Sequence, residues 1–312
     1  MKARILERVL NLLLDMGYEV LNCMGIRSCF DIIAKKEHIF LIKILTNVEA
    51  INNKSATELK NISKIISAVP LIVGERTKNT KLISGVIYAR YGISVINTKT
   101  LEEILKEQFP LIYSVRGNYC VRIKSELLSK LRKRMGFTQE ELASRLGISK
   151  QSVHRYESSG RISLKIAERL IDLLENDITI SRNIFRSESQ TSEINDLEYE
   201  YMEYITLTSL KKMVIDELNS IGFLAFPTNA PFDIIAKEQV HKKRILSVVS
   251  NDVKTIERKM EINRRITEIT GDYSVCISEK KHRLLNIPVI RPVDLSVIKN
   301  PREFMELLSE QT

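Results

Sequence analysis

Cysteine is scarce in this chain of 312 residues, which has only Cys23, Cys29, Cys120 and Cys276. Their spacing matches no metal-ligand pattern, and a disulfide framework would be sparse for this length. We therefore expect buried thiols in a reducing cytoplasm. We also expect no bound metal and no cofactor.

Long apolar runs are lacking as well, and no stretch approaches the length needed to span a bilayer. Residues 1–20 place charges inside their apolar run and lack a small-residue cleavage site, which indicates an amphipathic helix rather than a signal peptide. Basic charge is abundant, with a net charge of +9. Residues 122–170 hold twelve Lys or Arg against five Glu or Asp. This local excess favours a partner rich in phosphate, such as nucleic acid.

The middle of the chain, residues 131–160, reads LRKRMGFTQEELASRLGISKQSVHRYESSG. Thr138 followed by Glu141 is a capping box, which predicts the start of a short helix. Gly147 ends that helix, because glycine readily takes the left-handed conformation found at helix ends. Ser149 then caps a second helix.

The second helix of this pair should bury Val153 and Tyr156, which are three residues apart. Its other side chains face outward: Lys150, Gln151, Ser152, His154 and Arg155. Neighbouring helices at residues 124–134 and 163–174 complete a small core. The pattern therefore predicts a DNA-binding helix-turn-helix, and the alternative is a helical bundle used for protein contacts.

The run FTQEELAxxLGIS, followed by VHRYE, resembles the Cro/C1-type helix-turn-helix of repressors. The resemblance implies that residues 149–157 form a recognition helix in the DNA major groove. It places Ser149, Lys150, Gln151 and Arg155 nearest the bases. Ser152 and His154, on the outward side of the same helix, and Gln139 complete the set of candidate DNA-binding residues. Gln139 falls where family members touch a phosphate, whereas His154 is either a phosphate contact or a solvent-facing bystander.

The regions on either side of this motif share one order of elements, a helix, three strands, a helix and a strand. The string FDIIAK at residues 30–35 recurs at residues 232–237, in the same place of that order. Long helices are expected at residues 50–67 and 253–270, each followed by a buried strand. We interpret this repeat as a duplicated α/β domain.

The element order, with an Asp on one strand and a Lys on the next, resembles the restriction-endonuclease-like fold of nucleases. Those enzymes hold metal with a strand Asp and an acidic residue two places before a catalytic Lys. In the first copy Asp31 and Lys43 fit the outer roles, but Leu41 stands at the intermediate position.

In the second copy Asp233 is kept, while Ile245 and Ser247 are expected where the acid and the lysine would stand. Neither copy has the pair of carboxylates that a hydrolytic magnesium site requires. We therefore expect the shape of a nuclease without cleavage and no catalytic residues. Asp31 and Asp233 would then cap a turn or pair with a lysine.

The predicted fold is an α+β multidomain chain, with a central all-α Cro/C1-type helix-turn-helix between two related, degenerate nuclease-like α/β domains. The expected domains are residues 1–115, 121–180 and 206–312, with an acidic linker at residues 181–205. The linker is either a solvated connector or a segment that covers the basic face when DNA is absent.

As a whole, the chain resembles a family of archaeal transcriptional regulators. We expect a cytoplasmic, sequence-specific regulator that binds double-stranded DNA, is no enzyme and contacts no membrane. A homodimer is expected, because one recognition helix reads only a few base pairs. The α/β domains would supply the dimer contact, and no effector ligand is identified. The alternatives are a metal-dependent nuclease targeted by its helix-turn-helix, and an antitoxin-like or scaffolding protein that binds another protein.

Overall fold

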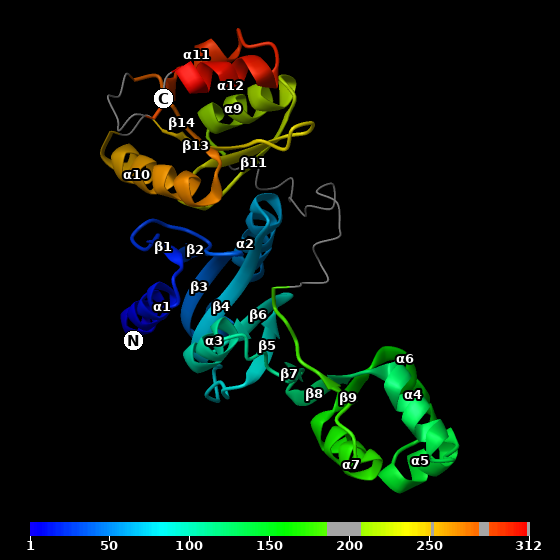
Figure 1. Ribbon diagram of the computed structural model, residues 1–312. Helices are drawn as coiled ribbons and strands as arrows, with labels where there is room; N and C mark the ends of the chain where they lie inside the picture. The colour runs from blue at the N-terminus through cyan, green and yellow to red at the C-terminus, as the bar shows by residue number, and fades with distance from the viewer. Residues whose placement is uncertain (186–206, 251–252, 281–286, 311–312) are drawn as a thin grey trace. The chain divides into compact units, whose positions relative to one another are not determined.

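The computed structural model describes residues 1–185, 207–250, 253–280 and 287–310 (Figure 1). The chain divides into two compact units. The first unit holds Met1–Ile44, Ala50–Leu71 and Glu188–Thr312, and the second holds Leu45–Glu49 and Ile72–Ser187. Most of the predicted linker, residues 186–205, lies outside the described residues.

The first lobe is the N-terminal part of the first unit, residues 1–44 and 50–71. Its amphipathic first helix buries one apolar face, Ile5, Leu6, Val9 and Leu13. Three antiparallel strands follow, with Ile32 opposite Ile42. The elements in chain order are α1 (Lys2–Asp15), β1 (Glu19–Asn22), β2 (Ile32–Lys35), β3 (Ile39–Asn47), the 3-10 helix η1 (Val48–Ala50), α2 (Asn53–Ile66) and β4 (Ala68–Arg76). The strands β3 and β4 continue into the second unit.

The second lobe is the C-terminal part of the first unit, residues 207–310. Its elements are α9 (Ser209–Ser220), β11 (Phe223–Pro227), β12 (Ile234–Glu238), β13 (Arg244–Val249), α10 (Val253–Thr270), β14 (Tyr273–Ile277), β15 (Val289–Ile290), α11 (Pro292–Leu295) and α12 (Pro301–Glu310). They build one sheet in the order β11-β12-β13-β14-β15. Its β11–β12 and β12–β13 pairs are antiparallel, and its β13–β14 and β14–β15 pairs are parallel.

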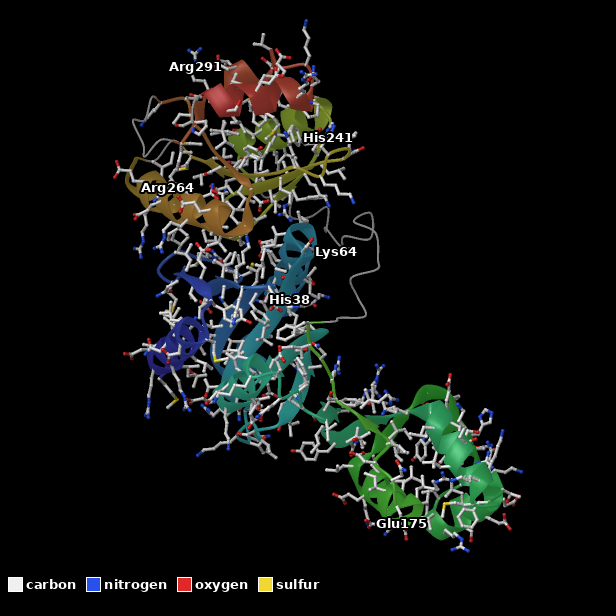
Figure 2. All side chains as sticks on the ribbon, in the orientation of Figure 1. His38, Lys64, Glu175, His241, Arg264 and Arg291 are labelled. Carbon is white, nitrogen blue, oxygen red and sulfur yellow. The ribbon has the colours of Figure 1, made fainter. Side chains whose placement is uncertain are left out.

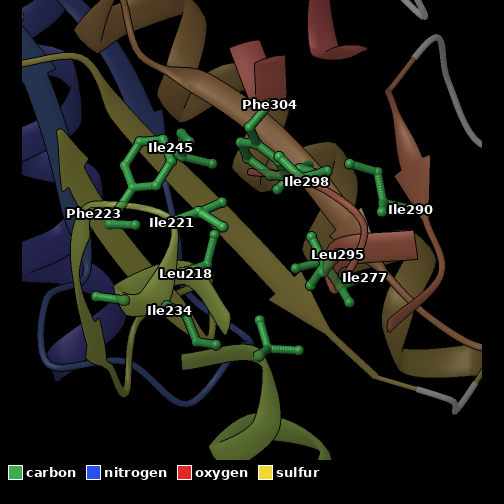
Figure 3. Packing of buried hydrophobic residues seen from close by; sticks show 14 of the residues in the cluster. Leu218, Ile221, Phe223, Ile234, Ile245, Ile277, Ile290, Leu295, Ile298 and Phe304 are labelled. Carbon is green, nitrogen blue, oxygen red and sulfur yellow. The ribbon is translucent and has the colours of Figure 1, made fainter. Parts of the chain in front are cut away.

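Helices cover both faces of the sheet in the second lobe. On one face α9, α11 and α12 pack against the strands, with the rings of Phe223 and Phe304 edge to face at 5.8 Å (Figure 3). On the other face α10 contributes Ile256 and Met260, which pack beside Val248 and Cys276. Burial of these apolar side chains is the main stabilising contribution to the lobe.

The two lobes repeat one order of elements, helix, three antiparallel strands, helix and strand, as the recurring FDIIAK string predicts. Their strand registers also correspond, because Ile32 lies opposite Ile42 and Ile234 lies opposite Ser247. The residue numbers of the first pair differ by ten and those of the second by thirteen, so the connection between the strands is longer in the second lobe. Ser247 is therefore the equivalent of Ile42.

The second unit contains a sheet in the order β6-β5-β7-β8-β10, with β9 paired to β8. Its elements are β5 (Val86–Arg90), β6 (Ile93–Ile96), α3 (Thr98–Leu105), β7 (Ile112–Val115), β8 (Asn118–Ile123), α4 (Ser125–Arg134), α5 (Gln139–Leu146), α6 (Lys150–Ser159), β9 (Arg161–Ser163), α7 (Leu164–Leu174) and β10 (Thr179–Ile180). The helices α4 to α7 start and end within two residues of the predicted bounds. The last of them, α7, ends at Leu174, and Glu175 is its C-cap (Figure 2).

The sequence predicts a purely helical core around these four helices, but strands contribute to it as well. Val121 and Ile123 from β8 and Ile162 from β9 belong to the same buried cluster as the helix residues. Residues 116–120, left between two predicted domains, form the turn and start of the β7–β8 hairpin. The first described residues of the predicted linker also pack on this unit, because Ile184 is buried and Phe185 meets Phe109 edge to face.

Candidate nucleic-acid interface

Hydrogen-bonded caps fix the start of α5 and of α6, as predicted. The Thr138 hydroxyl accepts a hydrogen bond from the Glu141 N–H at 3.1 Å, and the Glu141 carboxylate accepts one from the Thr138 N–H at 2.7 Å. The bond from the Thr138 N–H lowers the pKa of Glu141. At the start of α6, Ser149 Oγ accepts a hydrogen bond from the Ser152 N–H at 3.2 Å. Each helix therefore begins at the residue that the sequence pattern specifies.

Glycines in the left-handed conformation end both helices, Gly147 at φ +63° and Gly160 at φ +65°. A Cβ atom at Gly147 would meet nothing closer than Arg169 Nη1 at 3.8 Å. At Gly160 it would lie 2.7 Å from the Ile123 carbonyl oxygen and 2.9 Å from Ser125 Oγ. Gly147 is therefore needed only for its left-handed backbone conformation. Gly160 is needed for that conformation and also because a side chain there would clash with its neighbours.

The helix α6 turns two side chains inward, Val153 and Tyr156, which belong to the core cluster. The predicted contact residues lie on its other sides and are exposed, except for Ser152, which is half-buried: Ser149, Lys150, Gln151, Ser152, His154 and Arg155. Lys150 makes an exposed ion pair with Glu140 at 3.5 Å, and such a pair contributes little stability. The row of polar side chains is therefore open to a partner.

A nearly buried ion pair anchors the C-terminal half of α6 to α4. Arg132 Nε and Nη2 donate to the two Glu157 carboxylate oxygens at 2.6 and 3.2 Å, and Arg132 Nη1 donates to the Phe137 carbonyl oxygen at 2.7 Å. Burial raises the pKa of Glu157, but the hydrogen bonds from Arg132 and Gln139 outweigh burial and lower it. Sequence reasoning missed this pair, because nothing local marks two residues on different helices.

Gln139, predicted to touch a phosphate, is half-buried at the start of α5. Its side-chain amide donates to Glu157 Oε2 at 2.7 Å. One of its two amide hydrogens is thus committed to the protein, and the other is left to the predicted phosphate contact.

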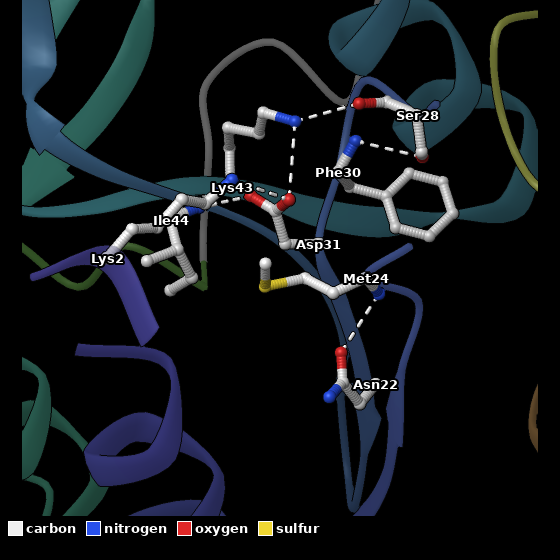
Figure 4. Close-up of polar contacts among 8 residues, drawn as sticks. All are labelled: Lys2, Asn22, Met24, Ser28, Phe30, Asp31, Lys43 and Ile44. Atoms are coloured by element: carbon white, nitrogen blue, oxygen red, sulfur yellow. Dashed lines mark hydrogen bonds and ion pairs between the residues drawn. The ribbon is translucent and has the colours of Figure 1, made fainter. Parts of the chain in front are cut away.

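In the first lobe, the carboxylate of Asp31 pairs with the side chains of two lysines (Figure 4). Its Oδ1 lies 3.0 Å from Lys2 Nζ and 3.5 Å from Lys43 Nζ, and its Oδ2 accepts a hydrogen bond from the Ile44 N–H at 2.8 Å. Lys43 also donates to the Ser28 carbonyl oxygen at 2.7 Å. Pairing with lysine, the alternative considered for this acid, is confirmed.

In the second lobe Asp233 also pairs with two lysines, although Lys259 comes from α10 whereas Lys43 comes from β3. Asp233 Oδ1 lies 2.7 Å from Lys211 Nζ and 2.8 Å from Lys259 Nζ, and its Oδ2 accepts a hydrogen bond from the Val249 N–H at 3.1 Å. The strand register also corrects one prediction. Leu246 and Val248, rather than Ile245 and Ser247, occupy the positions of Leu41 and Lys43.

These residues do not fit a catalytic divalent cation, which nuclease-like folds use and which needs several oxygen ligands. Among the described residues, Asp31 and Asp233 are the acids at this position, and lysine ammonium groups already neutralise the Oδ1 atom of each. Within the described part of the chain, no group of three His, Cys, Asp or Glu side chains is placed to hold a metal ion.

The thiols of Cys23, Cys29 and Cys276 are buried, as predicted, whereas the prediction is wrong for Cys120, which lies half-buried on β8. Burial raises the pKa of Cys23 and of Cys276 to about 12, and it raises that of Cys29 as well. Among the described residues no helix is long and apolar enough to cross a membrane.

Two families match parts of the chain. A PD-(D/E)XK superfamily domain matches residues 2–110, and a helix-turn-helix matches residues 128–180. The first match agrees with the resemblance inferred from Asp31 and Lys43, and the second spans α5 and α6. No solved structure matches the chain.

Three proteins from archaea are similar to nearly the whole chain, and each is named a "Putative HTH-type transcriptional regulatory protein". The protein from Thermococcus gammatolerans is 32% identical and that from Methanocaldococcus jannaschii is 30% identical. Each of these two comparisons covers 98% of this chain and 96% of the relative. The protein from Archaeoglobus fulgidus is 29% identical over 100% of this chain and 99% of its own.

Proposed function

The chain belongs to this family of HTH-type transcriptional regulatory proteins, and from that premise we propose that it is a DNA-binding regulator which recognises specific sequences. Residues 149–157 would be the recognition helix in the major groove. The observation that carries the proposal is the division of α6 into a side anchored by Val153, Tyr156 and Glu157 and an exposed polar row.

The chemistry of that row suits a DNA duplex. Arg155 can donate two hydrogen bonds to a guanine edge, and Gln151 can pair with an adenine edge. Lys150, His154 and the hydroxyls of Ser149 and Ser152 can reach phosphates or bases. Gln139, at the start of α5, would donate its second amide hydrogen to a phosphate.

A homodimer in the cytoplasm remains part of the proposal, because two recognition helices on two half-sites would give useful specificity. A binding selection from random duplexes should then enrich a short inverted repeat, with half-sites about one helical turn apart. Recovery of all duplexes with uniform affinity would count against sequence-specific recognition.

We also propose that the nuclease-like lobes do not cleave DNA. The supporting observation is the lysine ammonium groups against Asp31 and Asp233, together with Leu41 and Leu246 at the intermediate position. The lobes would then serve as a scaffold for the helix-turn-helix.

A further inference from the structure

The end of each long helix in the first unit receives a cation from the opposite lobe. Lys35 of β2, in the first lobe, donates to the Ile269 carbonyl oxygen of α10 at 2.6 Å. Arg244 of β13, in the second lobe, donates to the Ile65 carbonyl oxygen of α2 at 3.3 Å. The last carbonyl groups of a helix lack hydrogen-bond partners within the helix and favour positive charge. Each lobe therefore supplies a donor to the C-terminal end of the long helix in the other lobe.

The two acceptors are equivalent residues. Ile65 lies two residues before Ser67, which follows α2 with φ +58°, and Ile269 lies two residues before Gly271, which follows α10 with φ +77°. The two donors stand at the same rung of the repeated strand pair. Lys35 pairs with Ile39, and Arg244 pairs with Lys237.

The N-terminal halves of α2 and α10 also contact the opposite lobe. Glu58 on α2 accepts a hydrogen bond from the Asn229 N–H in the loop before β12. Arg258 on α10 donates to the Met24 carbonyl oxygen in the loop before β2, at 3.4 Å. The two loops meet where the Cys29 N–H donates to the Asn229 carbonyl oxygen at 2.8 Å.

Burial on α2 agrees with this arrangement. Leu59, Ile62 and Ile66 form one buried stripe at helical spacing. Glu58, Asn61 and Ile65 form a second buried stripe beside it, which includes the two residues that contact the second lobe. A helix buried on more than one side has a partner beyond its own sheet.

Reciprocal contacts between two copies of one fold are the mark of a two-fold, isologous interface. Here the two acceptors are equivalent residues, and the two donors lie on opposite strands of the same rung. We infer that the two lobes form an internal pseudo-two-fold pair, in which the second lobe of the same chain occupies the surface that a second copy would otherwise use. The α2 and α10 face is therefore closed to homodimerisation. A homodimer on DNA has to form through other surfaces, contrary to a dimer contact built from this face of the lobes.

Hydrogen exchange in the full chain tests the reciprocal caps. Lys35→Met should accelerate exchange in the last turn of α10, in the other lobe, about five- to tenfold, and Arg244→Met should do the same for α2. Lys36→Met is the matched control, because Lys36 donates to the Met16 carbonyl oxygen of its own lobe. Unchanged exchange in both opposite helices would overturn the pairing.

Cross-linking decides whether the pair forms within one chain. In a Cys120→Ser background, Met24→Cys with Arg258→Cys should be bridged by a short bismaleimide into a product of single-chain mass at every protein concentration. Mixing isotope-labelled Met24→Cys chains with unlabelled Arg258→Cys chains should give no mixed dimer. A mixed dimer, or no single-chain product from the folded double variant, would contradict the inference.

Discussion

Arg132 on α4 and Glu157 on α6 form a bidentate ion pair, and their side chains are only 9% and 10% exposed. The pair joins the helix before the predicted helix-turn-helix to the end of the proposed recognition helix. It therefore sets the direction in which the exposed row of α6 projects. Gln139 adds a third hydrogen bond to the same carboxylate.

Removing the charge of Glu157 should loosen α6. Glu157→Gln keeps the shape but leaves the Arg132 guanidinium without a full counter-charge, so near neutral pH it should cost about 1 to 3 kcal/mol. Hydrogen exchange of the α6 amide groups is the suitable measurement, because a multidomain chain need not unfold in one step. Glu140→Gln, at the exposed pair with Lys150, is the control and should change exchange little.

The same variant gives a pH test. The pKa of Glu157 is lower in the folded protein than its usual value. Its charged form therefore stabilises the fold above the unfolded pKa of about 4.3, and that contribution is lost as the pH falls through the folded pKa. The stability gap between the wild type and Glu157→Gln should shrink below about pH 4. A gap that stays constant down to about pH 3 would show that the ion pair is not its cause.

The two helix-ending glycines should respond differently to alanine. Gly147→Ala has room for its methyl group and should cost about 1 to 2 kcal/mol for the left-handed backbone alone. Gly160→Ala adds a clash with the Ile123 carbonyl oxygen, so it should cost roughly 1 to 3 kcal/mol more. Local hydrogen exchange in α5 and α6 measures both. Equal costs would mean that the close approach at Gly160 is absent.

Asp233 should be a stabilising counter-ion for two lysines. Asp233→Asn leaves the ammonium groups of Lys211 and Lys259 facing each other and should cost about 2 to 4 kcal/mol in the second lobe. Adding Lys259→Met removes the repulsion and should restore part of that stability. Exchange of the β12 and β13 amide groups reports the change. A double variant no more stable than Asp233→Asn would contradict this role.

The lobes should leave DNA intact. Supercoiled plasmid incubated with the protein and magnesium or manganese should remain supercoiled, because Asp31 and Asp233 each pair with lysines and the described residues bring no group of three metal ligands together. Asp31→Ala should behave as the wild type does. Nicking that disappears in Asp31→Ala would restore the nuclease hypothesis.

Much of the fold and of the candidate site could be predicted from short-range patterns in the sequence. Thr138, Glu141, Gly147 and Ser149 mark helix ends through contacts within four residues of the chain, so the sequence predicted α5 and α6 closely. The FDIIAK string predicted the repeat of the lobes. These features depend on nearby residues, and spacing alone reveals them.

Long-range features escaped prediction. The short strands β9 and β10 have little pattern of their own and exist because β8 pairs with them. The register of β13 depends on the length of a connection, which shifted the equivalents of Leu41 and Lys43 by one residue. The contacts of Lys35 with α10 and of Arg244 with α2 join residues that are far apart in sequence. No periodicity marks such pairs.

The central claim is that α6 reads bases, and affinity measured on two duplexes tests it most directly. Gln151→Ala and Arg155→Ala should each lose about 1 to 3 kcal/mol on the selected sequence and little on random DNA. Lys165→Ala, an exposed basic residue on α7, is the control and should not alter the preference. Equal losses on the selected and random duplexes would contradict base reading by α6.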